Sequence, residues 1–202
     1  MSENKKGRRG LTLVYTGHGK GKTTAALGIA LRSIGRGYKV KILQFIKSPQ
    51  RSYGEQIALE KLGVEMVQLG IGFTWLKTPE EHREALKKAW PQARDAVMSG
   101  EYDVVIWDEL NNALAIDKFP IDDVLPLDEV LETIRNRPSH VHLVITGRDA
   151  KPEIKEIADL EPVWCIVTDR RMYYVHEETG VVIEAEKHYY EDGVEAVKGL
   201  EF

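Results

Sequence analysis

Apolar and polar positions follow two alternating patterns along this chain of 202 residues. Short stretches rich in Val, Ile and Leu predict strands over residues 11–16, 40–46, 64–70, 103–109 and 141–147, of which the last two are expected to be buried. Between these stretches, helices are predicted over residues 23–33, 55–62, 79–97, 127–135 and 152–160, and in the first and third of them apolar residues recur at helical spacing. Near-continuous apolar strands separated by helices are typical of a mostly parallel sheet covered on both faces, so a three-layer α/β/α fold is expected.

Two of the predicted helices carry distinct local signals. The first has four apolar residues spaced to share one face, which should pack on the sheet: Leu27, Ala30, Leu31 and Ile34. The third begins after Thr78, where Thr78 as N-cap and Glu81 three residues later form the pattern of a capping box. Its start is therefore expected at Pro79, a residue favoured at the first helical position.

The two ends of the chain differ from this pattern. Residues 161–186 are rich in β-branched and aromatic side chains on either side of Glu178-Thr179-Gly180, and they predict a strand followed by a β-hairpin. Residues 1–10 are polar and basic and predict a flexible tail. The remaining residues, 11–202, are expected to form a single domain.

Composition and charge limit the classes of function. A net charge of −4 and a pI near 5.9 give no electrostatic reason to expect nucleic-acid or membrane binding. The single cysteine, Cys165, excludes an internal disulfide and a zinc site with several cysteines, and it fits a reducing, cytoplasmic setting. The N-terminal residues lack the apolar segment of a signal peptide, and no apolar run has the length of a transmembrane helix.

A glycine-rich segment, VYTGHGKGKTTAALG at residues 14–28, joins the first predicted strand to the first helix. Glycines in such a turn let backbone N–H groups converge on phosphate oxygens, and the helix N-terminus adds free donors. Lys22 can reach phosphates, and the Thr23 hydroxyl can ligate Mg²⁺. The candidate ATP-binding residues are Thr16, Gly17, His18, Gly19, Lys20, Gly21, Lys22, Thr23 and Thr24. Thr16 stands where the usual P-loop pattern has its first glycine.

An acidic pair and an arginine follow two later buried strands. Asp108 and Glu109 end the strand at 103–109, where P-loop enzymes place a carboxylate that holds Mg²⁺ or its water shell. The spacing does not distinguish which of the two contacts the metal. Arg148, after the strand at 141–147, either stabilises charge on a γ-phosphate or is a surface arginine. These features alone leave ATPases, small-molecule kinases and DNA-handling motors open.

Five segments together resemble the P-loop family of ATP:corrinoid adenosyltransferases, which is related in fold to the RecA-like ATPases. They are YTGHGKGKTTAALG (15–28), GFTW (72–75), WDEL (107–110), ITGR (145–148) and the ending KH…G…AxKGLEF (187–202). The resemblance covers about residues 11–160 and resumes from about 187. The chain departs from the family at His18, where asparagine is usual, and at Tyr189, where proline is common. The strand and hairpin at about 161–186 form an insertion that is atypical of the family.

The resemblance implies that the 5′-deoxyadenosyl group of ATP passes to the Co(I) of a reduced corrinoid, and that triphosphate leaves. It implies catalytic roles for Lys22, Thr23 and Glu109, a Mg²⁺ (or Mn²⁺) ion held by Thr23 with Asp108 or Glu109, a reduced flavoprotein as electron donor and a homodimer. Phe73 and Trp75, on a loop between glycines, are expected to bind the corrinoid with Arg148, because a broad apolar macrocycle needs aromatic walls. The alternative is that these two aromatics are core residues that cap the sheet.

The alternative functions differ in their products or in the residues that they require. A RecA-like ATPase or a regulatory ATP-binding module would release ADP rather than triphosphate. A thymidine kinase of related architecture usually carries a cysteine zinc site, which one cysteine cannot form. A corrinoid carrier would bind the cofactor without turning it over.

Overall fold

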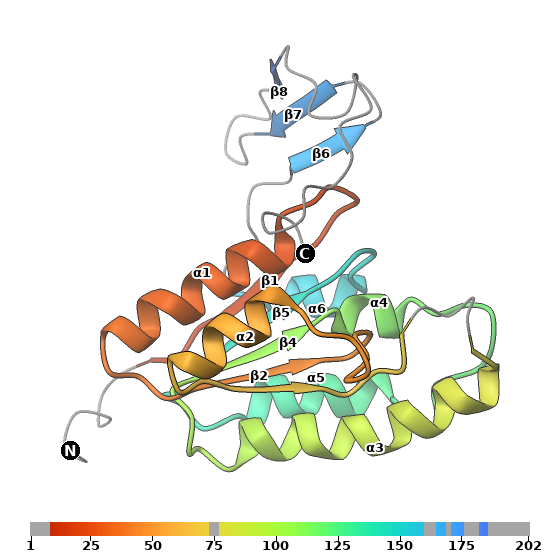
Figure 1. Ribbon diagram of the computed structural model, residues 1–202. Coiled ribbons are helices and arrows are strands. Elements are labelled where there is room, and N and C mark those ends of the chain that lie inside the picture. The colour runs from red at the N-terminus through yellow and green to blue at the C-terminus, as the bar shows by residue number, and fades with distance from the viewer. Residues whose placement is uncertain (1–8, 73–76, 160–164, 169–170, 176–181, 186–202) are drawn as a thin grey trace.

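Five parallel strands form the centre of the protein, seen in the computed structural model of Figure 1, which describes residues 9–72, 77–159, 165–168, 171–175 and 182–185. The strands are β1 (Thr12–Tyr15), β2 (Val40–Gln44), β3 (Glu65–Gln68), β4 (Val104–Asp108) and β5 (His142–Thr146). Their order in the sheet is β1-β5-β4-β2-β3, and every pairing between them is parallel. The predicted parallel sheet is confirmed.

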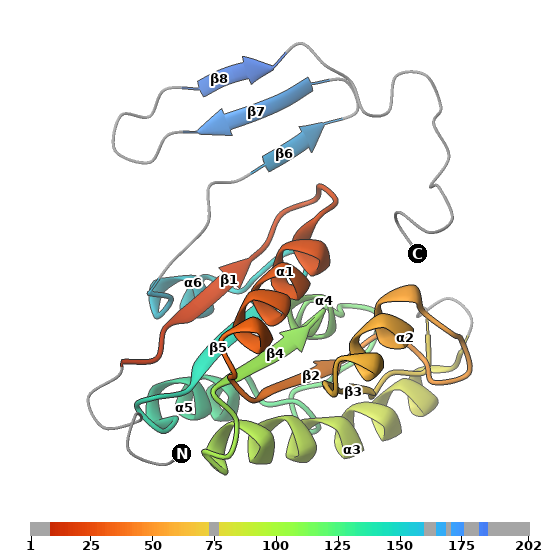
Figure 2. The same ribbon diagram turned by 60° about the vertical axis from the view of Figure 1, so that its left-hand side comes forward.

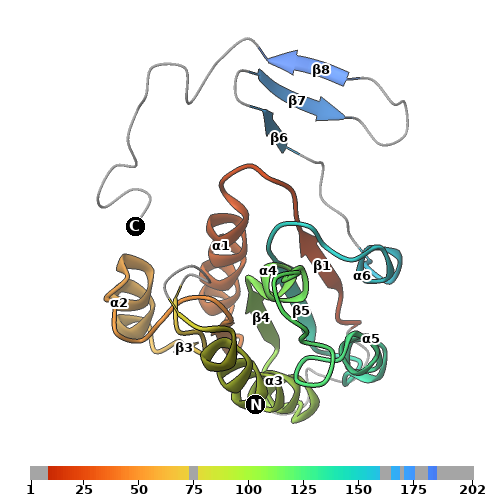
Figure 3. The ribbon, with the colours of Figure 1, turned by 90° about the vertical axis from the view of Figure 1, so that its right-hand side faces the viewer.

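Helices cover both faces of this sheet. They are α1 (Lys22–Gly35), α2 (Gly54–Lys61), α3 (Pro79–Met98), α4 (Leu110–Leu114), α5 (Leu127–Asn136) and α6 (Pro152–Glu156). Figure 3 shows α1 and α2 on one side of the strands and α3, α4 and α5 on the other. The expected three layers are therefore present. None of the helices in the described ranges combines the length and the apolar character needed to cross a lipid bilayer.

The central strands are apolar on both faces because each face is buried against helices. Ile42, Ile106 and Val144 belong to the cluster that includes Ala26 and Ala30 of α1. The next residue of each strand belongs to the opposite cluster, under α3, α4 and α5: Leu43, Trp107 and Ile145. Successive strand side chains point to opposite faces, so near-continuous apolar runs fill two cores at once.

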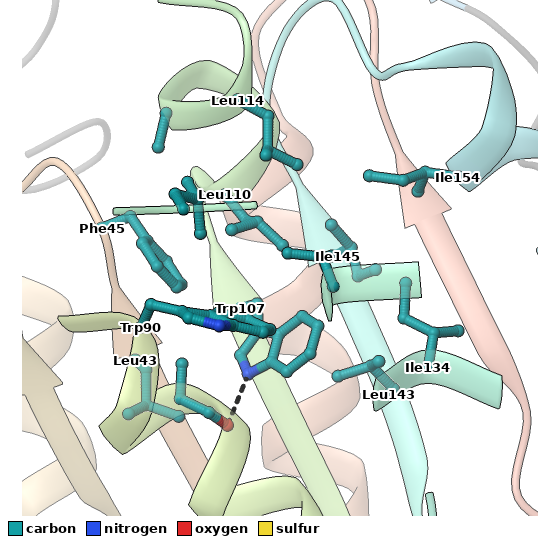
Figure 4. Close-up of a cluster of buried hydrophobic side chains, with 14 of the residues drawn as sticks. Leu43, Phe45, Trp90, Trp107, Leu110, Leu114, Ile134, Leu143, Ile145 and Ile154 are labelled. Carbon is teal, nitrogen blue, oxygen red and sulfur yellow. Dashed lines mark hydrogen bonds between the residues drawn. The ribbon is translucent and has the colours of Figure 1, made fainter. Parts of the chain in front are cut away.

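The second cluster fixes the end of β4. Trp107 and Trp90 of α3 pack edge to face, with ring centroids 5.4 Å apart, and Trp107 Nε1 donates a hydrogen bond to the Ala93 carbonyl at 3.1 Å (Figure 4). Both rings are buried, and Leu110 packs in the same cluster. This packing holds the β4–α4 turn, which carries the acidic pair, against the long helix α3.

The capping box at the start of α3 is confirmed. Thr78 Oγ1 accepts a hydrogen bond from the Glu81 N–H at 3.2 Å, and Glu81 Oε2 accepts one from the Thr78 N–H at 2.9 Å. Pro79 occupies the first turn, where its missing N–H has no helical partner to lose.

Three details of the helices differ from the predictions. Leu31 was expected on the core face of α1 but is 56% exposed, because α1 turns the small residues Ala26 and Ala30 to the sheet. Helix α6 ends at Glu156 rather than near residue 160, because the chain turns back to β1, where the Asp159 N–H bonds the Thr12 carbonyl at 2.9 Å. The five-residue helix α4 was not predicted, since its short apolar stretch has no recognisable period.

The C-terminal strands form a separate antiparallel sheet. Strands β6 (Cys165–Thr168), β7 (Arg171–Val175) and β8 (Val182–Ala185) lie in that order, as Figure 2 shows. The predicted strand and hairpin are confirmed, although the expected turn at 178–180 lies outside the described residues. Only Arg9 and Gly10 of the predicted tail are described, and the Gly10 N–H bonds the Ser139 carbonyl at 2.6 Å.

Candidate active site

The candidate site lies at the carboxyl edge of the parallel sheet. Because the strands run in one direction, the loops that follow them all leave from this edge, where ligands bind in open α/β proteins. The segments that follow β1, β4 and β5 therefore leave the sheet at the same edge (Figure 2).

The loop after β1 has the backbone of an anion site. Gly17 has φ 107° and Gly21 has φ 101°, in the left-handed region that favours glycine. Gly21 is also the N-cap of α1, so no cap side chain competes for the first N–H groups of this helix. Its first turn contains no acidic residue. A helix N-terminus of this kind attracts phosphate through its free donors and its dipole.

The Lys22 ammonium group folds over the inside of this loop. Its Nζ donates to the Gly17 carbonyl at 2.8 Å and to the Gly19 carbonyl. Burial lowers the pKa of Lys22, and the Arg148 cation lowers it further, whereas Glu109, Asp149 and Asp108 act in the opposite direction. Lys22 therefore shares one electrostatic environment with the acidic pair and the arginine that the sequence singled out.

Asp108 is fully buried and forms the centre of the polar contacts. Its Oδ1 accepts hydrogen bonds from Thr23 Oγ1 at 2.9 Å and from Thr146 Oγ1 at 2.7 Å, and its Oδ2 accepts one from Gln44 Nε2 at 2.8 Å. The Thr23 hydroxyl thus commits its proton to Asp108, which leaves its oxygen lone pairs free to ligate a cation.

Glu109 is held in an unusual conformation beside Asp108. Its backbone is left-handed, with φ 63°, and its N–H donates to Thr146 Oγ1 at 2.9 Å. Burial, and then the neighbouring Asp108 charge, raise the pKa of Glu109 to about 7, although Lys47, Lys22 and Arg148 act to lower it. Strained backbones of this type cluster at functional sites. A cation bound beside Glu109 would favour its charged form.

The loop after β5 is tied to the glycine loop and to α4. The Ala150 N–H donates to Thr16 Oγ1 at 3.1 Å, and His18 Nε2 lies 3.2 Å from Asp149 Oδ1. The Arg148 N–H donates to Asn112 Oδ1 at 2.7 Å. These contacts hold the backbone of the loop after β5 against the glycine loop and α4, and the Arg148 side chain is exposed.

Most of the predicted site residues meet at this edge. The contacts and charges above bring together Thr16, Gly17, His18, Gly19, Gly21, Lys22, Thr23, Asp108, Glu109 and Arg148. Lys20 and Thr24 lie in the same loop and helix start, and both are exposed. Phe73 and Trp75 lie outside the described residues, so their predicted role is not tested.

Four residues near the site were not predicted from the sequence. They contact Asp108, change the pKa of Glu109 or contact the glycine loop: Gln44, Lys47, Thr146 and Asp149. Gln44 and Thr146 are the last residues of β2 and β5, each after an apolar run. A polar residue at the end of a parallel strand lies at the carboxyl edge of the sheet, where ligands bind. This position was the signal in the sequence that could have identified both residues.

The donor atoms suit a hard divalent cation. Thr23 offers a hydroxyl oxygen, and Asp108 and Glu109 offer carboxylate oxygens, which Mg²⁺ prefers. Among the residues that the structure describes, no group of three or more His, Cys, Asp or Glu side chains is arranged to hold a metal. Mg²⁺ in nucleotide sites needs only one or two protein ligands, since phosphates and water supply the rest.

This combination defines a P-loop nucleotide-binding protein: a glycine loop between a strand and a helix, a lysine and a threonine at the helix start, and a buried aspartate on another parallel strand that accepts from the threonine. The sequence pattern of the family described as ATP:corrinoid adenosyltransferase BtuR/CobO/CobP matches residues 8–202. The chain belongs to this family, as the five segments of the sequence predicted.

Named relatives agree with this assignment. The corrinoid adenosyltransferase of Escherichia coli is 40% identical over 152 residues, which are 75% of this chain and 74% of that protein. The corrinoid adenosyltransferase CobA of Salmonella typhimurium is 34% identical over 199 residues, 96% of this chain and 86% of that protein. The corrinoid adenosyltransferase of Pseudomonas aeruginosa is 35% identical over 198 residues, 96% of this chain and 84% of that protein.

Proposed function

We propose that this chain catalyses the reaction of its family at the carboxyl edge of the sheet: it transfers the 5′-deoxyadenosyl group of ATP to the Co(I) of a corrinoid. The cobalt electron pair forms a Co–C5′ bond, the C5′–O bond breaks, and its electrons leave with inorganic triphosphate. Cobalt becomes Co(III) in the product. The observation that carries the proposal is the glycine loop with Lys22, linked through Thr23 to Asp108.

The leaving group explains why a phosphate-binding loop suits this reaction. Attack at C5′ requires the whole triphosphate to depart, so negative charge grows at the oxygen that leaves C5′. Lys22, Lys20 and the N–H groups at the start of α1 would stabilise that charge. The protein supplies positioning and electrostatics, whereas the cobalt supplies the nucleophile.

We propose that Thr23 and Asp108 hold Mg²⁺ (or Mn²⁺), with Asp108 acting through the Thr23 hydroxyl or a bound water, and that Glu109 faces the same ion. When bound, the ion neutralises phosphate charge and lowers the barrier to its departure. Asp108 fits the role nearest to Thr23, because its Oδ1 accepts the Thr23 proton. Glu109 fits a position beside the ion, because its raised pKa reflects a buried carboxyl group that a cation would stabilise.

The corrinoid is expected on the outer side of the same edge. Phe73 and Trp75 lie between β3 and α3 in the sequence, and the exposed Arg148 follows β5. We assign these three residues to the corrinoid. The reductant that supplies Co(I) is expected to be a reduced flavoprotein, the enzyme a homodimer, and the setting cytoplasmic, as for the family that the sequence resembles.

The test is an anaerobic mixture of the protein, Mg-ATP and chemically reduced cob(I)alamin. The expected result is loss of the Co(I) absorbance and formation of a photolabile alkylcobalamin in catalytic amounts. Variants Phe73→Ala and Trp75→Ala should raise the KM for the corrinoid and leave ATP affinity unchanged. Failure of the wild-type protein to consume cob(I)alamin would contradict the proposal.

A further inference from the structure

We infer that Gln44 is a positioning residue for this site: its side-chain amide, anchored by Gln68, orients the Asp108 carboxylate toward Thr23 and thereby couples metal binding to nucleotide binding. The inference rests on the proposed function only in taking Mg-ATP as the substrate. The structural basis is a row of side-chain amide hydrogen bonds across three neighbouring strands.

The three side chains occupy one row of the sheet. Gln44 ends β2, and its register partners are Asp108, which ends β4, and Gln68, which ends β3. Gln44 is fully buried. Its Nε2 lies 2.8 Å from Asp108 Oδ2, and its Oε1 lies 3.4 Å from Gln68 Nε2. These hydrogen bonds therefore connect Gln68 on β3, through Gln44, to the Asp108 carboxylate.

The direction of each amide in this row is fixed by carboxylates at its two ends. Asp108 Oδ2 accepts the hydrogen bond in this row, so the Gln44 NH₂ group faces Asp108 and the Gln44 oxygen faces Gln68. At the far end, Gln56 Nε2 donates to Glu60 Oε1 at 2.9 Å, which turns the Gln56 oxygen to Gln68. Gln68 Nε2 then donates to Gln56 Oε1 at 2.9 Å as well as to Gln44. One arrangement of the three amides therefore makes all four hydrogen bonds of the row.

A buried glutamine at this position stabilises the fold less than an apolar side chain of the same size would. The neighbouring residues Leu43 and Phe45 are buried and apolar, and an apolar side chain would fill the same space without a polar group to satisfy. The amide is explained by what it does to Asp108. Its hydrogen bond occupies Oδ2, so Oδ1 stays turned to Thr23 and Thr146.

Loss of the Gln44 donor would free the carboxylate to rotate. Oδ1 would then no longer hold the Thr23 proton, and the Thr23 lone pairs would no longer be directed at the cation. Residues that orient metal ligands in this way typically change metal affinity or activity by about 10- to 100-fold when they are replaced. The loss of the Gln44 donor should therefore reduce the extent to which Mg²⁺ strengthens ATP binding.

The experiment measures the ATP dissociation constant by calorimetry, once in EDTA and once in Mg²⁺. The ratio compared is the EDTA value divided by the Mg²⁺ value, which states how much the metal strengthens ATP binding. Gln44→Met keeps the side-chain length and removes the donor. We expect it to reduce this ratio by about 10-fold or more, with the EDTA value within about twofold of wild type, because apart from the metal the phosphates are held by the glycine loop and Lys22. Gln92→Met is the matched control, since Gln92 is exposed on α3 and donates to the Lys88 carbonyl of the same helix.

A second variant keeps the inference testable if Gln44→Met does not fold. Gln68→Met leaves the Gln44–Asp108 bond in place but removes its anchor, and it should reduce the ratio by a smaller factor of about 3. An unchanged ratio in the folded Gln44→Met protein, or in Gln68→Met where Gln44→Met does not fold, would overturn the inference. The readout needs no corrinoid, so a failed adenosylation assay with an altered ratio would contradict the proposed function alone.

Discussion

Replacing Glu109 by glutamine should stabilise the protein at alkaline pH while it abolishes turnover. Burial and the neighbouring Asp108 raise the pKa of Glu109 from 4.5 to about 7 in the folded protein. Between these two values the folded protein keeps a proton that the unfolded chain has released, so the free energy of unfolding falls as pH rises through this window. Glutamine has the same shape and never ionises, so the variant should lack this loss.

The size of the effect follows from the same pKa values. The gap between 4.5 and about 7 is about 2.5 pH units, and each unit corresponds to about 1.4 kcal/mol. Wild type should therefore lose about 3 kcal/mol between pH 4.5 and pH 8 through this group. Glu109→Gln should be close to wild type near pH 5 and more stable by up to about 3 kcal/mol at pH 8.

The assay is urea unfolding followed by tryptophan fluorescence from pH 5 to pH 8.5, in EDTA and without nucleotide. Glu101→Gln is the matched control, because Glu101 is exposed in a loop. A stability difference for Glu109→Gln that stays constant across the pH range would contradict a raised pKa of Glu109 in the folded protein. So would a variant that is less stable than wild type at pH 8.

Three further substitutions test other parts of the structure. Thr78→Ala removes the capping box with Glu81 and should lower the free energy of unfolding by about 1 kcal/mol in urea, with turnover unchanged. Gly147→Ala places a β-carbon 2.6 Å from Asn112 Oδ1 at a residue with φ 129°, so it should cost about 1–3 kcal/mol and lower the melting temperature. Lys22→Met removes the main cation of the glycine loop and should lower kcat/KM for adenosylation by about 10²–10³-fold, measured by steady-state kinetics, with the far-ultraviolet circular dichroism spectrum unchanged.

Each of these expectations has a clear contrary result. Unchanged urea stability of Thr78→Ala would mean that the α3 start is held by other contacts. A Gly147→Ala protein as stable as wild type would contradict the close approach of Asn112. Full adenosylation by Lys22→Met would show that the glycine loop does not hold the triphosphate.

The strands were predictable because their runs are rich in apolar residues, and β4 is buried along its whole length, whereas their order in the sheet was not predictable. Nothing in the local pattern places β5 between β1 and β4, since that order depends on contacts between residues far apart in sequence. The exposed Leu31 shows the same limit on α1: a period of 3.6 residues identifies a helix, but small residues also allow a second face to pack closely.

The site was predictable where the chemistry imposes a motif. Lys22, Thr23 and Asp108 follow from the glycine loop and from an acidic residue at a strand end, and the structure brings these three together. Gln44 was not predictable in the same way, because a single glutamine after an apolar run resembles any strand end. Only its register opposite Asp108 gives it a role.

The central claim is that ATP loses its adenosyl group rather than its terminal phosphate. The most direct measurement is ³¹P NMR of the products formed from Mg-ATP and a Co(I) corrinoid by the protein without oxygen. We expect inorganic triphosphate in a one-to-one ratio with the adenosylated corrinoid. ADP and inorganic phosphate, with the corrinoid unchanged, would contradict it and leave a P-loop ATPase.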